Sequence, residues 1–240
     1  MTTNSFKFKI KIDTSSCGGI ITAYSSLLND TWYYKDLSFE SGKIYGLVSE
    51  YGQGCEFLSY LLGGRVTFDH VKIFFNDDVI AQNNLSRMSW NLEAACEKYG
   101  TKIVRKSIEK ALKDNPDSMT FQDLAERFAL TPGRYDRKFK YLSGERWRAA
   151  AAFGYAQNKR IYFSPYETSN FYYQMCQSGL LKCLRELTDH GALVVLPCGN
   201  DMFIKHIADE VLYLDKNYNY NMNALQSFYA RQGNANWIKL

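Results

Sequence analysis

A glycine-bearing segment between an apolar run and an amphipathic run is the part of this sequence best placed to bind an anion. The apolar run Ile44 to Val48 leads into it, and a run that begins at Phe57 follows it. Strand, glycine-bearing loop and helix form the layout in which backbone N–H groups and a helix N-terminus hold phosphate oxygens. The residues of interest in the loop are Ser49, Gly52, Gln53, Gly54, Cys55 and Glu56.

The loop departs from the phosphate-binding motif G-x-x-x-x-G-K-[ST] at most of its fixed positions. Gly54 keeps the second glycine, but Ser49 replaces the first, Cys55 the lysine and Glu56 the magnesium-binding hydroxyl. The changes at Cys55 and Glu56 move the local charge by about two units toward negative, and each close pair of unit charges is worth roughly 4 kcal/mol at 4 Å with an effective dielectric constant near 20. Taken alone, such a turn is more often a plain connection between strand and helix.

A second segment changes this interpretation, because it resembles the signature of the nucleotide-binding domains of ATP-binding-cassette (ABC) transporters. The family pattern is L-S-G-G-[EQ]-x-x-R and opens an alanine-rich helix. The matching residues here are Leu142, Ser143, Gly144 and Glu145, followed by Arg146 to Ala152. The second glycine of the pattern is absent. Segments similar to the family's phosphate-loop strand, Walker B strand and last strands occur in the same order along nearly the whole chain.

This resemblance implies an α/β fold, the P-loop ABC nucleotide-binding fold. It would have a mixed, largely parallel core sheet, an N-terminal antiparallel β part and an inserted helical subdomain. Residues 1–84 and 146–240 would form the core with its antiparallel part, and residues 85–145 the helical signature subdomain.

The sequence pattern by itself also predicts the elements that position these segments. Alternation from Phe6 to Ile12 is typical of a half-buried strand, and Asn76-Asp77 offers a hairpin turn between Val71–Phe75 and Val79–Ile80. Apolar residues at helical spacing predict one helix over Leu92 to Leu112. Further predictions are a capping box at Thr120 and Asp123, a helix from Glu145 to Gln157, a strand at 161–163, a helix from Phe171 to His190 and a strand at 192–196.

The departures from the family pattern indicate a site that does not hydrolyse ATP. The family's Walker B aspartate positions magnesium and its glutamate activates water, but the aligned positions here are Pro165 and Tyr166. The switch histidine falls at Gly199, and the Q-loop glutamine falls near Glu93. We therefore expect no catalytic residue, no metal site and no nucleotide at this chain's own loop. The aromatic residue that stacks on adenine is not assigned among Trp32, Tyr33 and Tyr34.

The signature implies a role in trans. In ABC dimers the two domains lie head to tail, so each nucleotide lies between the phosphate loop of one and the signature of the other. The resemblance implies a heterodimer with a competent ATPase subunit, with a homodimer as the alternative, and a transmembrane transporter subunit. Residues 142–145 would then contact ATP and Mg at a composite site. The simpler alternative is that Ser143 only caps a helix and Glu145 favours its dipole.

Other functions stay open, and composition excludes a few. One alternative is a regulatory or scaffold protein with a cassette fold, and another is a P-loop-like small-molecule kinase. The net charge of +4 comes from scattered Lys and Arg, so we expect no nucleic-acid partner. The six cysteines show no C-x-x-C spacing, and no apolar run is long enough for a membrane span. We expect a cytoplasmic protein, peripheral on the inner face of the membrane through a transporter subunit.

Overall fold

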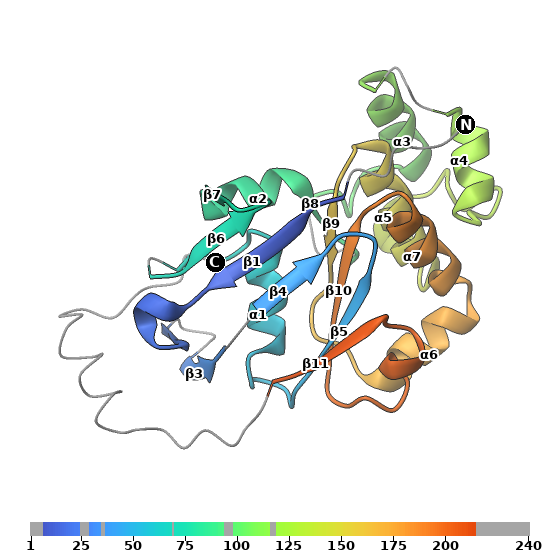
Figure 1. Ribbon diagram of the computed structural model, residues 1–240. Coiled ribbons are helices and arrows are strands. Elements are labelled where there is room, and N and C mark those ends of the chain that lie inside the picture. The colour runs from blue at the N-terminus through green and yellow to red at the C-terminus, as the bar shows by residue number, and fades with distance from the viewer. Residues whose placement is uncertain are drawn as a thin grey trace.

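The computed structural model describes residues 7–24, 29–34, 37–68, 70–93, 98–115 and 119–214. Figure 1 shows a central sheet with helices on both sides, an antiparallel sheet built from early strands of the chain, and a group of helices at one end. This arrangement agrees with the fold class expected from the sequence.

The core sheet has five strands in the order β11-β5-β10-β9-β8, and every pair in it is parallel. All residues of β5 and β10 are buried, because helices cover both faces of the sheet. Helix α1 packs against β9 and β10, and helix α7 also contacts β10. The bounds are β5 Ile44–Val48, β8 Ser89–Asn91, β9 Ile161–Phe163, β10 Leu193–Cys198, β11 Glu210–Tyr213, α1 Cys55–Leu62 and α7 Leu180–Asp189.

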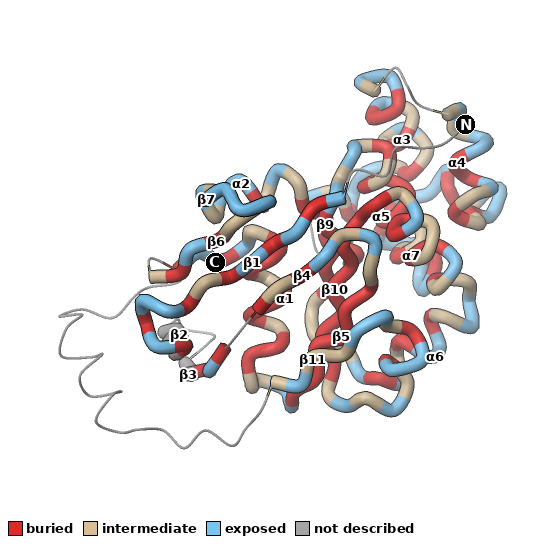
Figure 2. Tube along the Cα trace, in the orientation of Figure 1, coloured by how far each residue is buried: buried red, intermediate tan, exposed pale blue. Residues whose placement is uncertain are grey.

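Alternate residues of the core strands enter two hydrophobic clusters. Tyr45 and Leu47 of β5 pack with α1 and the antiparallel sheet, whereas Ile44 and Val48 pack with the helices on the other face. Figure 2 shows the buried residues concentrated along β5, β10 and helix α5 (Glu145–Ala156). The strand that leads into the loop is therefore packed on both faces.

The antiparallel part is a four-stranded sheet in the order β4-β1-β6-β7, with a separate hairpin of β2 and β3. The predicted hairpin turn is confirmed: Asn76 and Asp77 both have positive φ, at 50° and 70°, the combination that a two-residue type I′ turn requires. The bounds are β1 Lys9–Asp13, β2 Ile20–Tyr24, β3 Asn29–Tyr33, β4 Leu37–Glu40, β6 Lys72–Phe75 and β7 Asp78–Ile80.

The helical end of the molecule contains α3 (Val104–Lys113) and α4 (Phe121–Arg127), and α3 packs on α5. The capping box is confirmed, since the Thr120 hydroxyl accepts from the Asp123 N–H and the Asp123 carboxylate accepts from the Thr120 N–H. Strand β8 lies within the range 85–145 although it pairs with β9 in the core sheet. The division of the chain into a core and a helical subdomain stays a prediction.

Two helix predictions are wrong in extent. The segment from Leu92 to Leu112 is not one helix, because Leu92 directly follows β8 and α3 begins only at Val104. The segment from Phe171 to His190 forms two helices, α6 (Ser169–Gln177) and α7, because Gly179 takes a left-handed conformation with φ of 94° between them. Helix α2 (Gln82–Met88) and the short 3-10 helices Ser15–Cys17, Phe139–Tyr141 and Ile204–His206 complete the described elements.

Among the described residues, no helix combines the length and apolar character needed to cross a membrane.

Candidate functional site

The predicted strand, loop and helix are present at the phosphate-loop position. Strand β5 ends at Val48, and α1 begins at Cys55 with Gly54 as its N-cap in a left-handed conformation, φ 97°. Within the loop, the Gln53 N–H donates to the Glu50 carbonyl at 3.0 Å, and the Cys55 N–H donates to the Ser49 hydroxyl at 3.3 Å. The loop is therefore closed by its own hydrogen bonds.

Two buried aromatic side chains fix the loop from the antiparallel side. The Trp32 indole N–H donates to the Gly52 carbonyl at 3.1 Å, and the Tyr34 hydroxyl donates to the Gly54 carbonyl at 2.6 Å. The Trp32 ring also stacks on Phe57 of α1 at 4.6 Å. Trp32 and Tyr34 are only 2% and 1% exposed. Neither ring is thus open to a base, whereas Tyr33 between them is 37% exposed.

The two residues that replace the lysine and the hydroxyl of the motif point to different partners. The Cys55 thiol is buried and lies 4.0 Å from the Ser49 carbonyl oxygen. Burial raises its pKa, so the thiol is neutral at physiological pH. Glu56 Oε1 accepts a hydrogen bond from the Tyr166 N–H at 3.2 Å. The position of a metal-binding hydroxyl thus holds a carboxylate that is bonded to the segment after β9.

The aligned Walker B and switch positions meet in space. Residues 165 and 166 follow β9, and Gly199 follows the neighbouring strand β10. The Tyr166 hydroxyl lies where a side chain on residue 199 would begin, so only glycine fits at 199 without displacing it. The Tyr166 ring also meets Tyr51 of the loop edge to face, with centroids 5.2 Å apart. Burial raises the pKa of Tyr166, with the Cys55 and Cys198 thiols adding to the effect.

Sequence reasoning missed Glu167 beside these positions, and it did not predict that Glu93 binds Arg146. Glu93 is 4% exposed and accepts from Arg146 Nε at 2.8 Å and from the Trp147 indole N–H at 2.9 Å. Burial raises the pKa of Glu167, the Glu93 and Glu56 carboxylates raise it further, and Arg146 opposes them. The available signal was that Glu167 directly follows the two positions aligned with the Walker B acids.

At the signature segment, Ser143 and Gly144 are exposed but the Glu145 carboxylate is buried. Ser143 and Gly144 are exposed, and Ser143 takes a positive φ of 48°. Glu145 is 4% exposed, and its Oε1 accepts from the Thr131 N–H at 2.7 Å. Its Oε2 forms ion pairs with Arg134 at 3.4 Å and Arg148 at 3.5 Å. The side chain that would repel an anion at this surface is thus held inside the helical part.

The helix-capping alternative for Ser143 does not match the local geometry. Gly144 is the N-cap of α5, and no side chain makes a capping hydrogen bond there. The Glu145 and Arg146 N–H groups donate to the carbonyls of Leu142 and Ser143 at 3.1 and 3.2 Å. The start of α5 is thus held by backbone bonds, which leaves the Ser143 hydroxyl outside the capping scheme.

The residues around the loop do not fit a magnesium triphosphate. Such a ligand needs lysine and metal to neutralise its charge, but the loop offers a neutral thiol and the Glu56 carboxylate. In the described part of the chain, no group of three or more His, Cys, Asp or Glu residues is placed to hold a metal ion. The structure brings the loop, Tyr166 and Gly199 together, whereas Leu142 to Glu145 contact the helical part.

Comparison with proteins of known structure identifies the fold. No family model matches the sequence, and no curated protein is significantly similar in sequence. The fold is similar to a nucleotide-free ATP-binding cassette from an ABC transporter, with TM-score 0.58, 13% identity and coverage of 86% of this chain and 87% of that chain. It is also similar to a putative ABC transporter ATP-binding protein from Pyrococcus furiosus, with TM-score 0.59, 13% identity and coverage of 87% and 97%.

A further match is a bacterial Atm1-family ABC exporter with ATP bound. The TM-score is 0.59 at 15% identity, and the match covers 98% of this chain and 43% of the exporter chain. The element order, the parallel core sheet, the antiparallel part and the helical end all correspond to what the sequence resemblance implied. The chain has the fold of the ATP-binding cassettes of ABC transporters.

Proposed function

We propose that this chain is a cassette subunit whose own nucleotide site does not hydrolyse ATP, and that it acts by presenting Ser143 and Gly144 to ATP held by a competent partner cassette. Leu142 and Glu145, which the sequence also assigned to this contact, are only 1% and 4% exposed. The observation that carries the proposal is the contact between Tyr166 and Gly199. The Tyr166 hydroxyl takes the space beside residue 199, the position that the resemblance aligns with the switch histidine of a working cassette.

Charge at the loop supports the first half of the proposal. A bound triphosphate would lie near Glu56, with Glu167 and Glu93 close enough to influence one another electrostatically. Each such carboxylate within about 4 Å of a phosphate charge opposes binding by roughly 4 kcal/mol at an effective dielectric constant near 20. Backbone N–H groups at the start of α1 offset part of this cost only.

The exposed signature supports the second half. Ser143 and Gly144 present backbone and hydroxyl groups at a helix start, where the helix dipole favours an anion. Because Arg134 and Arg148 hold the Glu145 carboxylate inside, the missing second glycine of the signature does not place a negative charge on this surface.

The proposed partners follow from the fold. One structural neighbour is a complete ABC exporter with ATP bound. We infer that this chain pairs with a competent ATPase subunit as a heterodimer and docks with it on a transmembrane subunit, which would keep it at the inner face of the membrane. ATP and magnesium would then be held by the partner's loop.

The first experiment measures ATP binding and magnesium-dependent hydrolysis by the purified chain alone. We expect neither above the buffer background. Sustained hydrolysis that needs magnesium would contradict the proposal and would direct attention to Glu167 as a base.

The second experiment purifies the chain from membranes with its bound subunits and measures the ATPase activity of the complex. Ser143→Glu should lower this activity by about tenfold or more, because it places bulk and a negative charge where a γ-phosphate would approach. Ser178→Glu, at the exposed end of α6, is the matched control and should leave the activity unchanged. Equal activity of the two variants would show that the signature is structural only.

A further inference from the structure

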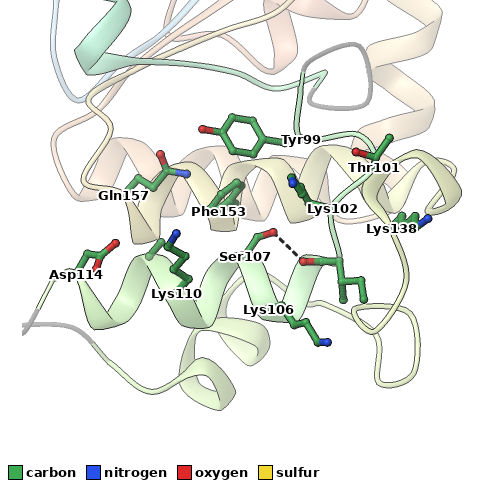
Figure 3. A pocket seen from close by; sticks show the side chains of 12 residues that line it. Tyr99, Thr101, Lys102, Lys106, Ser107, Lys110, Asp114, Lys138, Phe153 and Gln157 are labelled. Carbon is green, nitrogen blue, oxygen red and sulfur yellow. Dashed lines mark hydrogen bonds between the residues drawn. The ribbon is translucent and has the colours of Figure 1, made fainter.

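A cavity lies in the helical part, between α3 and the end of α5. Its volume is about 630 Å³, within the range of about 300–1,000 Å³ typical of small-molecule sites. Figure 3 shows Lys106, Ser107 and Lys110 along α3 and Asp114 directly after it, with Phe153 of α5 and the following Gln157 on the opposite side. None of these residues belongs to the phosphate loop or to residues 142–145, so the cavity is independent of the proposed function.

The floor of the cavity is apolar and built from rings. Tyr99 and Phe153 meet edge to face with centroids 5.1 Å apart, and Trp90 supports both at 5.0 Å. Phe153 is 5% exposed and Tyr99 is half-buried. Because these rings pack on one another, the floor is a preformed surface for a flat or apolar group.

The rim of the cavity is strongly cationic. Its lining contains four lysines, Lys102, Lys106, Lys110 and Lys138, against one acid, Asp114. Lys106 and Lys110 are one helical turn apart on α3, a spacing at which like charges repel. No salt bridge involves any of the four lysines within the part of the chain that the structure describes.

Backbone pairing brings the lysines from separate segments to one rim. The Phe139 N–H donates to the Lys102 carbonyl at 3.1 Å and the Lys140 N–H to the Gly100 carbonyl at 3.0 Å. Ile103 and Lys138 also form an isolated antiparallel bridge. Backbone pairing thus gathers four lysines from two segments around one apolar floor. A ligand that neutralises Lys106 and Lys110 would relieve the repulsion between them.

We propose that this cavity binds a small organic anion with a flat or apolar body and two or more phosphate, sulfate or carboxylate groups. The rings of the floor would contact the body, and the lysines would pair with the anionic groups. A lysine ammonium is a point charge without the fixed fork of arginine, so the site selects for negative charge more than for one anion geometry.

The test uses 8-hydroxypyrene-1,3,6-trisulfonate as the probe and fluorescence anisotropy of the full chain as the readout. We expect saturable binding that weakens as salt is added. Lys102→Gln combined with Lys110→Gln should weaken binding by about tenfold or more, whereas Lys102→Arg with Lys110→Arg should retain it.

The matched control is Lys113→Gln combined with Lys182→Gln, which removes the same net charge from exposed positions outside the cavity. It should weaken binding far less. An equal loss in the two Gln pairs, or no loss in the cavity pair, would overturn the proposal. So would equally tight binding of uncharged 1-pyrenemethanol, or tighter binding of polyglutamate, which would assign the surface to an acidic protein segment. Thermal unfolding of each variant confirms that it is folded.

Discussion

The phosphate-loop region and the signature region of this molecule differ in where their polar side chains lie. Around the loop, the Glu56 carboxylate accepts from the Tyr166 backbone N–H, and the Tyr166 side chain takes the space beside Gly199. At the signature, Glu145 turns inward and leaves Ser143 and Gly144 exposed. The scaffold of both regions is intact, because it is held by strand pairing and apolar burial rather than by the groups that perform chemistry. Side chains of the chain itself can therefore occupy space in the phosphate-loop region while the signature segment stays exposed.

The largest expected effect is a loss of stability when the buried Glu145 carboxylate is removed. Glu145→Ala removes the partner of Arg134, Arg148 and the Thr131 N–H, so we expect the free energy of unfolding to fall by about 3 kcal/mol. Chemical denaturation of the variant measures it. Glu126→Ala, exposed on α4, is the control and should change stability little. If the two variants were equally stable, the inward position of Glu145 would not be maintained by these contacts.

A smaller change in the free energy of unfolding is expected where Trp32 and Tyr34 pack against the loop at Gly54. Gly54→Ala introduces a Cβ that would lie 2.7 Å from the Tyr34 hydroxyl oxygen, whereas Gly52→Ala, also at positive φ, meets no described atom within 4 Å. Both substitutions should lower the free energy of unfolding because alanine disfavours the left-handed conformation. Gly54→Ala should lower it by about 2 kcal/mol more, because its Cβ overlaps the aromatic side chains. Equal unfolding free energies would mean that Trp32 and Tyr34 do not hold the loop.

The smallest effect is a pH dependence at Glu167. Burial and the neighbouring carboxylates raise its pKa above the ordinary value of 4.5, so the folded chain binds this proton more tightly than the unfolded chain does. The ionised form therefore costs stability at neutral pH, and the cost disappears as pH falls through the raised pKa toward 4.5. Glu167→Gln should raise the melting temperature at neutral pH and make little difference in acid. A difference that is the same at both pH values would contradict this origin.

Local pattern predicted many elements and failed where a distant partner decides the conformation. The hairpin at Asn76-Asp77 and the capping box at Thr120 were predictable because the residues that determine them lie within a few positions of one another. The single helix over Leu92 to Leu112 was wrong because Leu92 continues the pairing of β8 with β9, its N–H donating to the Phe163 carbonyl, about seventy residues further along the chain. Helical spacing alone does not reveal such pairing.

The same distinction applies to the candidate site. The sequence by itself determined which residue types stand at the positions aligned with the family motifs, namely Cys55 for the lysine, Pro165 and Tyr166 for the Walker B acids and Gly199 for the switch histidine, because a residue type is a property of its own position. Only the tertiary structure decided that Tyr166 meets Gly199, that Glu93 binds Arg146 and that Glu145 is buried. Each of these contacts joins different strands, helices or loops, and their positions are set by packing of the whole core.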